Sequence, residues 1–221
     1  MMVTASWRRA SALVVAGLLA STGCSGGERS ADESSAAWGI CEEFFGAADV
    51  EAVRKAMGDA EPRPEAPQKL DALAEAMAEE ASTRAANTED LSRASYEPCR
   101  IAASRGDTAQ RVSGQVKWSV LTLRSLSRGA LAREWRQVAK GVHVHSADGG
   151  DRVSLLVTCQ VPKAPANQRE DVPLEVEVSQ VGLSGGDPKL PERLVLSLAG
   201  TMRHVLHCTD AVTLPSRLPA R

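Results

Sequence analysis

The first 24 residues constrain most what this chain can fold into, because they decide the redox environment of everything that follows. Arg8 and Arg9 precede an apolar run, Ala10–Ala20, in which Leu, Val and Ala dominate. This run is too short to span a membrane, which takes roughly 20 apolar residues, and it fits the apolar region of an export signal. The sequence therefore predicts a signal peptide over residues 1–23 and an oxidising compartment for the rest of the chain.

The signal ends in the motif Ser21-Thr22-Gly23-Cys24. Small residues leading into a cysteine resemble the lipobox of bacterial lipoproteins, in which the cysteine is diacylated and becomes the new N-terminus. The resemblance implies lipidation of Cys24 and attachment to the extracytoplasmic face of the cell membrane. Each buried methylene contributes about 0.8 kcal/mol, so two acyl chains would anchor the protein stably. The alternative is an ordinary secretory signal that leaves Cys24 as a free thiol.

Hydrophobic periodicity predicts three helices in the exported chain. Apolar residues recur at three- and four-residue steps from Trp38 to Met57, after Pro67, and after Asp187, where the stripe runs to Leu206. Alternating or continuous apolar residues predict strands at 96–104, 111–123, 142–145, 153–161 and 174–181. Residues 24–37 contain no large apolar side chain and are predicted to form a flexible tether.

Helices and strands are segregated along the chain and do not alternate as βαβ units, which favours an α+β fold. We expect a mainly antiparallel sheet with two N-terminal helices and one C-terminal helix packed on it. The exported chain is long enough for one sizeable core. We therefore expect a single domain over residues 38–221, made of two similar-sized units at about 38–125 and 135–214.

Besides Cys24, the chain contains four cysteines: Cys41, Cys99, Cys159 and Cys208. None shows the Cys-x-x-Cys spacing of a zinc or redox site, so in an exported chain they are expected to form disulfides. Four cysteines permit three connectivities. The order of elements favours Cys41 with Cys99 and Cys159 with Cys208, because each pair would then join a helix end to a strand.

These features together resemble a group of small secreted lipoproteins of GC-rich Gram-positive (actinobacterial) bacteria. The resemblance is carried by Cys24, the helix start Trp38-Gly39-Ile40-Cys41, the hairpin and strand at Gly141–Cys159, and the final helix at Leu190–Cys208. It covers most of the exported chain. It implies a location at the cell envelope and brings no particular activity with it.

Charge is distributed unevenly along the chain. Residues 24–110 contain nine more acidic than basic residues, whereas residues 111–221 contain five more basic than acidic ones. Between Arg111 and Lys140 a single acid, Glu134, accompanies seven candidate anion-binding residues: Arg111, Lys117, Arg124, Arg128, Arg133, Arg136 and Lys140. On an outward face these side chains could bind anionic lipid headgroups or envelope polymers. The alternative is that they pair with the acidic N-terminal helices.

A serine motif and two histidine pairs are the candidates for chemistry. Gly182–Gly186 matches G-x-S-x-G around Ser184, but five residues separate this motif from the expected helix, whereas a nucleophile elbow begins its helix at the serine. The motif is therefore interpreted as a turn, and an envelope serine hydrolase using Ser184 remains an alternative function.

His143 and His145 alternate with valines on a strand, so they are expected to face away from the core. His204 and His207 are expected on the outer face of the last helix. Two pairs that both point outward do not converge, and no metal site is predicted. A metal-binding lipoprotein using His143 and His145 remains a further alternative.

Composition excludes several other functions. Aromatic residues make up 3% of the chain, too few for a stacking platform, so nucleic acid is not an expected partner. The sequence contains no phosphate loop or dinucleotide fingerprint, and no cofactor is expected. The leading interpretation is a lipid-anchored, non-catalytic binding domain, not an enzyme, whose partner is an anionic envelope polymer or an envelope protein.

Overall fold

The computed structural model describes residues 27–84, 93–147, 150–183 and 187–219 of the 221-residue chain. The expected signal peptide, Cys24 and Ser184 lie outside the described residues. Within the described ranges, no helix is long and apolar enough to cross a membrane.

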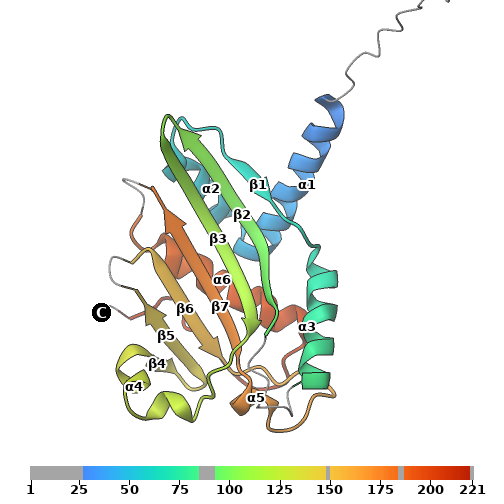
Figure 1. Ribbon diagram of the computed structural model, residues 1–221, viewed down its shortest axis with the longest axis vertical. Helices are drawn as coiled ribbons and strands as arrows, with labels where there is room; N and C mark the ends of the chain where they lie inside the picture. Colours follow the sequence, from blue (N-terminus) through green and yellow to red (C-terminus); the bar gives the residue numbers. More distant parts are fainter. Residues whose placement is uncertain (1–26, 85–92, 148–149, 184–186, 220–221) are drawn as a thin grey trace, which may run out of the picture.

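The centre of the fold is one antiparallel sheet of seven strands with helices packed on one face, which confirms the predicted α+β class (Figure 1). The strand order is β1-β2-β3-β7-β6-β5-β4. The strands are β1 (Arg63–Glu65), β2 (Ser95–Arg105), β3 (Thr108–Trp118), β4 (Arg136–Ala139), β5 (Val142–Ser146), β6 (Arg152–Val157) and β7 (Leu174–Val181). Pairing of β3 with β7 joins strands of the N-terminal and C-terminal halves, so the two predicted units are halves of one sheet.

In Figure 1 the helices α1 (Gly27–Phe45), α2 (Ala47–Met57) and α6 (Leu190–Val205) pass behind the sheet, and α3 (Leu70–Arg84) stands beside it. Alternation along each strand sends one row of side chains towards them, as in β3, where Val112, Val116 and Trp118 are buried. The indole of Trp118 donates a hydrogen bond to the Met77 carbonyl at 2.8 Å. Its polar N–H is therefore satisfied inside the core, where an unpaired donor would be costly.

At Gly114 of β3 side chains from two helices approach the sheet closely. A Cβ atom there would lie 2.8 Å from Cζ of Phe45 on α1 and 2.9 Å from Cδ2 of Leu198 on α6. Any side chain would push these two core residues apart, and overpacking of this kind destabilises a core. Glycine is thus needed at this position for packing.

Both disulfides join the cysteines that the order of elements favoured. Cys41 of α1 is bonded to Cys99 of β2, with a Cα–Cα distance of 5.3 Å, and Cys159 is bonded to Cys208 at 4.8 Å. Both distances lie in the usual range for a disulfide. The first bridge ties α1 to β2, and the second ties the segment after α6 to the segment after β6, so the predicted connectivity is confirmed.

The first helix differs from the sequence analysis in two ways. Residues 27–37 are helical, whereas a flexible tether was predicted for 24–37. Once Trp38–Phe45 is packed, extending the helix backwards gains a backbone hydrogen bond for each residue ordered, so this segment needs no apolar partner of its own. The predicted helix also breaks at Gly46, whose φ of 85° is incompatible with a helix.

The sequence analysis missed the two edge strands and the shortest helices. β1 has three residues and β4 has four, too short to show a period-two pattern. The short helices are η1 (Ser125–Ser127), α4 (Leu131–Glu134) and α5 (Gln168–Asp171). These elements form because neighbouring parts of the fold hold them in place, and sequence periodicity does not reveal that.

Candidate functional site

The segment that joins β3 to β4, residues 119–135, folds over one end of the open face of the sheet. Its Leu126 and Trp135 bury themselves against Leu156 of β6 and form a second, smaller apolar cluster. The Leu123 amide donates to the Glu170 carbonyl at 2.9 Å, which fixes this covering segment beside α5. Much of the predicted basic segment is therefore a structural cover that apolar residues hold in place. The charge pattern of the sequence did not indicate this role.

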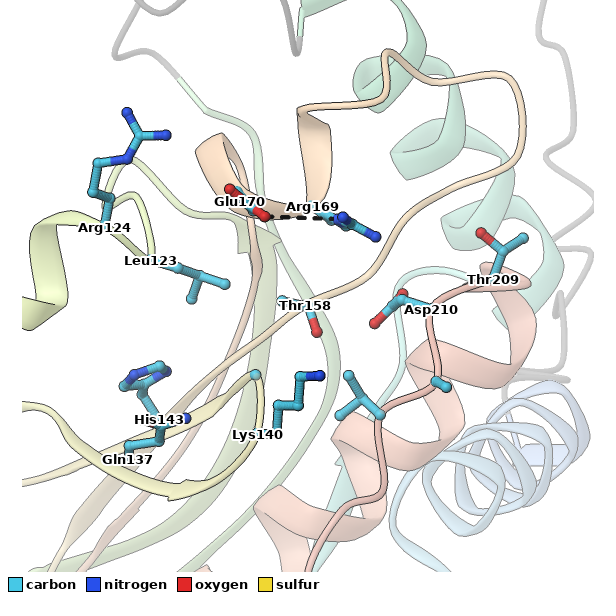
Figure 2. Close-up of a pocket in the computed structure, with 13 residues that line it drawn as sticks. Leu123, Arg124, Gln137, Lys140, His143, Thr158, Arg169, Glu170, Thr209 and Asp210 are labelled. Atoms are coloured by element: carbon cyan, nitrogen blue, oxygen red, sulfur yellow. Dashed lines mark ion pairs between the residues drawn. The ribbon is translucent and has the colours of Figure 1, made fainter.

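A cleft of about 700 Å³ opens beside this cover, where β5 begins and β6 ends (Figure 2). Its volume lies within the range of small-molecule binding sites. Its walls come from the cover, the β4–β5 turn, the end of β6, α5 and the segment after α6: Leu123, Arg124, Gln137, Lys140, Gly141, His143, Thr158, Arg169, Glu170, Thr209, Asp210, Ala211 and Val212.

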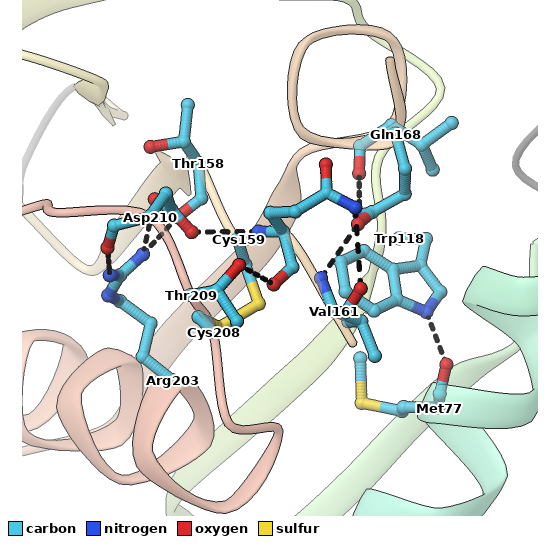
Figure 3. Close-up of a disulfide and its surroundings, with 12 residues drawn as sticks. Met77, Trp118, Thr158, Cys159, Val161, Gln168, Arg203, Cys208, Thr209 and Asp210 are labelled. Carbon is cyan, nitrogen blue, oxygen red and sulfur yellow. Dashed lines mark hydrogen bonds and ion pairs between the residues drawn. A yellow bond between two sulfur atoms is a disulfide. The ribbon is translucent and has the colours of Figure 1, made fainter. Parts of the chain in front are cut away.

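The wall formed by the segment after α6 is fixed to the end of β6. The disulfide between Cys159 and Cys208 lies at its base (Figure 3). The Thr209 amide donates to the Gln160 carbonyl at 2.9 Å, and the Gln160 amide donates to Asp210 Oδ1 at 2.7 Å. These bonds fix the segment after α6 against the residues that follow β6 and position Thr209 and Asp210 in the cleft.

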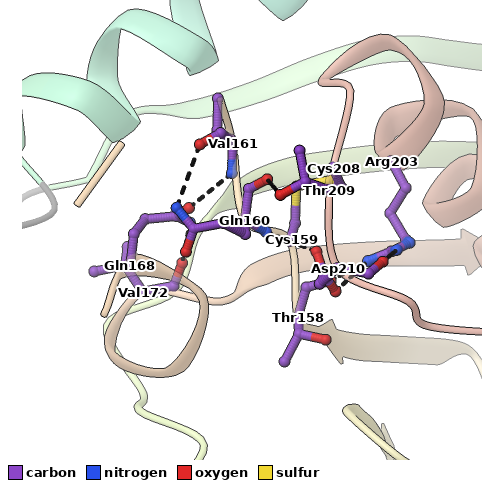
Figure 4. Close-up of polar contacts among 10 residues, drawn as sticks. All are labelled: Thr158, Cys159, Gln160, Val161, Gln168, Val172, Arg203, Cys208, Thr209 and Asp210. Carbon is purple, nitrogen blue, oxygen red and sulfur yellow. Dashed lines mark hydrogen bonds and ion pairs between the residues drawn. A yellow bond between two sulfur atoms is a disulfide. The ribbon is translucent and has the colours of Figure 1, made fainter. Parts of the chain in front are cut away.

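Arg203 of α6 also holds the segment after α6 against the end of β6 (Figure 4). Its Nη2 donates to the Asp210 carbonyl at 2.9 Å, and its Nη1 lies 3.1 Å from Asp210 Oδ2 and also donates to the Thr158 carbonyl. The two side chains are 11% and 8% exposed. The Asp210 carboxylate is therefore neutralised by Arg203 and leaves the cations of the cleft without a partner.

A buried glutamine supports the floor between β6 and α5. Gln168 is fully buried; its Oε1 accepts from the Val161 amide at 3.0 Å and its Nε2 donates to the Val172 carbonyl at 3.0 Å. The side chain thus satisfies backbone groups that no strand or helix partners, which burial requires.

Two cations of the cleft form no ion pair with any residue in the described ranges: Arg124 and Lys140. Both are exposed. In Figure 2 Lys140 is drawn among His143, Thr158 and Asp210, whereas the Arg124 side chain extends away from them. The third cation, Arg169, is 3.9 Å from Glu170.

His143 lines the same cleft from β5. It points away from the core, as expected, because Val142 and Val144 on either side are buried. Its Nδ1 is buried and has no hydrogen-bond partner in the protein. Burial lowers the pKa of His143 below its usual value, so the imidazole is neutral at neutral pH.

The other predicted anion-binding residues do not reach the cleft. Lys117 pairs with Glu175 of β7 at 3.0 Å, which differs from the alternative of pairing with the acidic N-terminal helices. Arg136 donates to the Pro219 carbonyl at 2.9 Å. Three more are exposed at other places on the surface: Arg111, Arg128 and Arg133. The structure therefore brings together Arg124 and Lys140 from the predicted set of seven.

His145 does not share the cleft with its neighbour His143. Its ring lies 5.4 Å from that of Trp135 in the covering segment. His204 of α6 and His207, just after that helix, are both exposed. Among residues 27–84, 93–147, 150–183 and 187–219, no three His, Cys, Asp or Glu side chains are grouped closely enough to hold a metal ion.

Comparisons of the chain with protein-family models, with curated protein sequences and with solved structures found no match. The fold and the cleft by themselves define an α+β domain, cross-linked by two disulfides, with a partly cationic cleft at one end of its sheet.

Proposed function

We propose that this protein is a lipid-anchored, extracytoplasmic, non-catalytic domain that binds an anionic group of the cell envelope in the cleft. One observation carries the proposal: Arg124 and Lys140, from two separate segments, line one cleft without a carboxylate partner in the described part of the chain. Cations left without a partner in a concave site attract anions and raise their local concentration. The two sources of carboxylate in the cleft, Glu170 and Asp210, are already paired with arginines.

The construction of the cleft supports binding. Three of its walls are held in place by a disulfide, by the ion pair between Arg203 and Asp210, and by the buried Gln168. A ligand that enters a site built in advance pays less for ordering the protein, and this favours affinity. The cleft is also several times larger than a single phosphate or sulfate ion, so it suits an anionic group that belongs to a larger molecule.

Charge reversal in the cleft tests the binding proposal. Arg124→Glu combined with Lys140→Glu is expected to weaken binding of soluble poly(glycerol phosphate) by about tenfold or more, which is about 1.4 kcal/mol, because two attractions become repulsions. Raised salt is expected to weaken binding of the unmodified protein. The measurement is titration calorimetry at fixed pH and ionic strength.

The matched control is Arg128→Glu combined with Arg133→Glu, the same change of net charge on exposed residues outside the cleft. It is expected to lower affinity by much less. Equal losses in the two double variants would show that the overall field of the protein, and not the cleft, attracts the polymer.

Replacement of the lipidation residue tests the anchor. Cys24→Ala is expected to move the protein from the membrane fraction to the soluble fraction, since the motif ending at Cys24 is the basis of the proposed anchor. The measurement is cell fractionation followed by detection of the protein, with Cys24 left intact as the reference. Retention of the variant in the membrane fraction would contradict lipid anchoring.

A further inference from the structure

Three polar side chains from separate segments line the cleft together. They are Lys140, Thr158 and His143, from the β4–β5 turn, the end of β6 and β5 respectively. The ammonium group can only donate, and the hydroxyl and the imidazole can each donate as well. Three donors that line one cleft, with one permanent positive charge, match the oxygens of a tetrahedral oxyanion.

We propose that His143, Lys140 and Thr158 hold the phosphodiester group of an envelope polymer, and that binding takes up a proton on His143. This inference rests on the proposed function of the cleft and names its ligand class. A phosphodiester carries one negative charge and stays ionised at all physiological pH values, so the proton comes to the protein and not to the ligand. The remainder of the cleft is available to the polymer units on either side of the bound group.

The surroundings of His143 decide the sign of the pH effect. On the sheet it pairs with Gln137 of β4 and Leu156 of β6, which carry no charge. The charged groups that share the cleft with it are Arg124, Lys140, the pair of Arg169 with Glu170, and the pair of Asp210 with Arg203. Burial opposes protonation of the imidazole and lowers the pKa of His143.

A bound anion reverses this balance, because it attracts the imidazolium and raises the pKa of His143. By linkage, the ligand then binds most tightly below the lowered pKa of the empty site. Affinity falls as pH rises through the interval between that pKa and the higher pKa of the complex. Above both pKa values it reaches its weakest level.

The position of the cleft favours a polymer over the headgroups of the membrane to which the protein would be attached. Figure 1 shows α5 and the β4–β5 hairpin at the end of the molecule opposite the Gly27 end of α1. A lipid on Cys24 lies three residues before Gly27, and a chain of that length spans at most about 10 Å. The membrane would thus lie at the α1 end, and the cleft would face the opposite side.

The experiment measures affinity for soluble poly(glycerol phosphate) by calorimetry at pH 5.5 and pH 7.5, on the protein without its signal peptide. We expect affinity to be about tenfold higher at pH 5.5, and proton uptake to appear as a dependence of the binding heat on the buffer. NMR of the imidazole is expected to show that the pKa of His143 rises when the polymer is added.

Two variants separate His143 from general effects. His143→Gln keeps a polar side chain of similar size and is expected to bind with the same weak affinity at both pH values. His145→Gln removes the histidine on the same face of β5 that lies outside the cleft, and it is expected to keep the pH dependence. Equal affinity of the unmodified protein at pH 5.5 and pH 7.5, or a pH dependence that survives His143→Gln, would overturn the role of His143.

Failure of this inference differs from failure of the proposed function. If the polymer binds without pH dependence but is still lost on charge reversal at Arg124 and Lys140, the anionic cleft stands and the proton-coupled site does not. Phosphatidylglycerol vesicles provide the second arm of the experiment. Binding to vesicles that depends on His143, with no binding to the soluble polymer, would overturn the assignment to a polymer and assign the phosphodiester to a lipid headgroup.

Discussion

Replacing Cys159 and Cys208 by serine is expected to lower the free energy of unfolding by about 4 kcal/mol. The bridge closes a loop of 49 residues, and in the chain-entropy model a cross-link of that length restricts the unfolded chain by about this amount. Because domains are stable by about 5–15 kcal/mol in total, the loss is severe. Urea denaturation of the oxidised protein and the double variant at the same pH measures it.

The same double variant is expected to lose binding in the cleft even where it remains folded. Cys208 holds the start of the segment that supplies Thr209 and Asp210 to the cleft wall. The matched control is Cys41→Ser with Cys99→Ser, which opens a loop of 58 residues far from the cleft. Its stability should fall by a similar amount, about 4 kcal/mol, with binding by the folded fraction retained. Equal binding losses in both variants would mean that the disulfide acts on global stability alone.

Arg203→Met is the second substitution with a large expected effect. Asp210 is 8% exposed, and removing Arg203 leaves its carboxylate buried without a cation and the Thr158 carbonyl without that donor. Breaking a buried ion pair by removing one partner costs about 3–5 kcal/mol. Chemical denaturation of the variant and of the unmodified protein measures this loss.

A second replacement distinguishes the buried charge from lost packing. Arg203→Met combined with Asp210→Asn removes both charges and is expected to recover part of the stability, since no unpaired ion then remains buried. Arg193→Met is the matched control on the same helix, because Arg193 pairs with Asp49 and Asp187 but is 39% exposed. Its cost should be within about 1 kcal/mol. Similar losses of unfolding free energy for Arg193→Met and Arg203→Met would contradict the importance of burial for the pair of Arg203 with Asp210.

Several elements could be predicted from sequence because each carries its own pattern. Strand β7 occupies 174–181, the range that its alternation predicts, with Leu174, Val176 and Val178 buried. The three predicted helices are present, although Gly46 divides the first. A regular period of two or of 3.6 residues identifies an element whose one face is buried, and these elements supply most of the core.

The candidate site was predictable only in part. Arg124 and Lys140 belong to the basic segment that the sequence analysis selected, but the five others in that segment serve elsewhere or lie exposed. Thr158 and Asp210 are ordinary polar residues in a sequence, and no spacing marks them. They enter the cleft because Arg203 and the second disulfide bring the end of β6 and the segment after α6 together.

The sequence by itself determined the α+β class and the main strands, because local periodicity carries that information, and the order of elements favoured one of the three pairings of the cysteines. The tertiary structure decided the rest. It determined that β3 pairs with β7 to make one sheet, that Gly114 leaves room for Phe45 and Leu198, and that a cleft forms. These features depend on contacts between residues far apart in the chain, and the free energy of such contacts depends on how both partners are positioned, which neither partner's local sequence specifies.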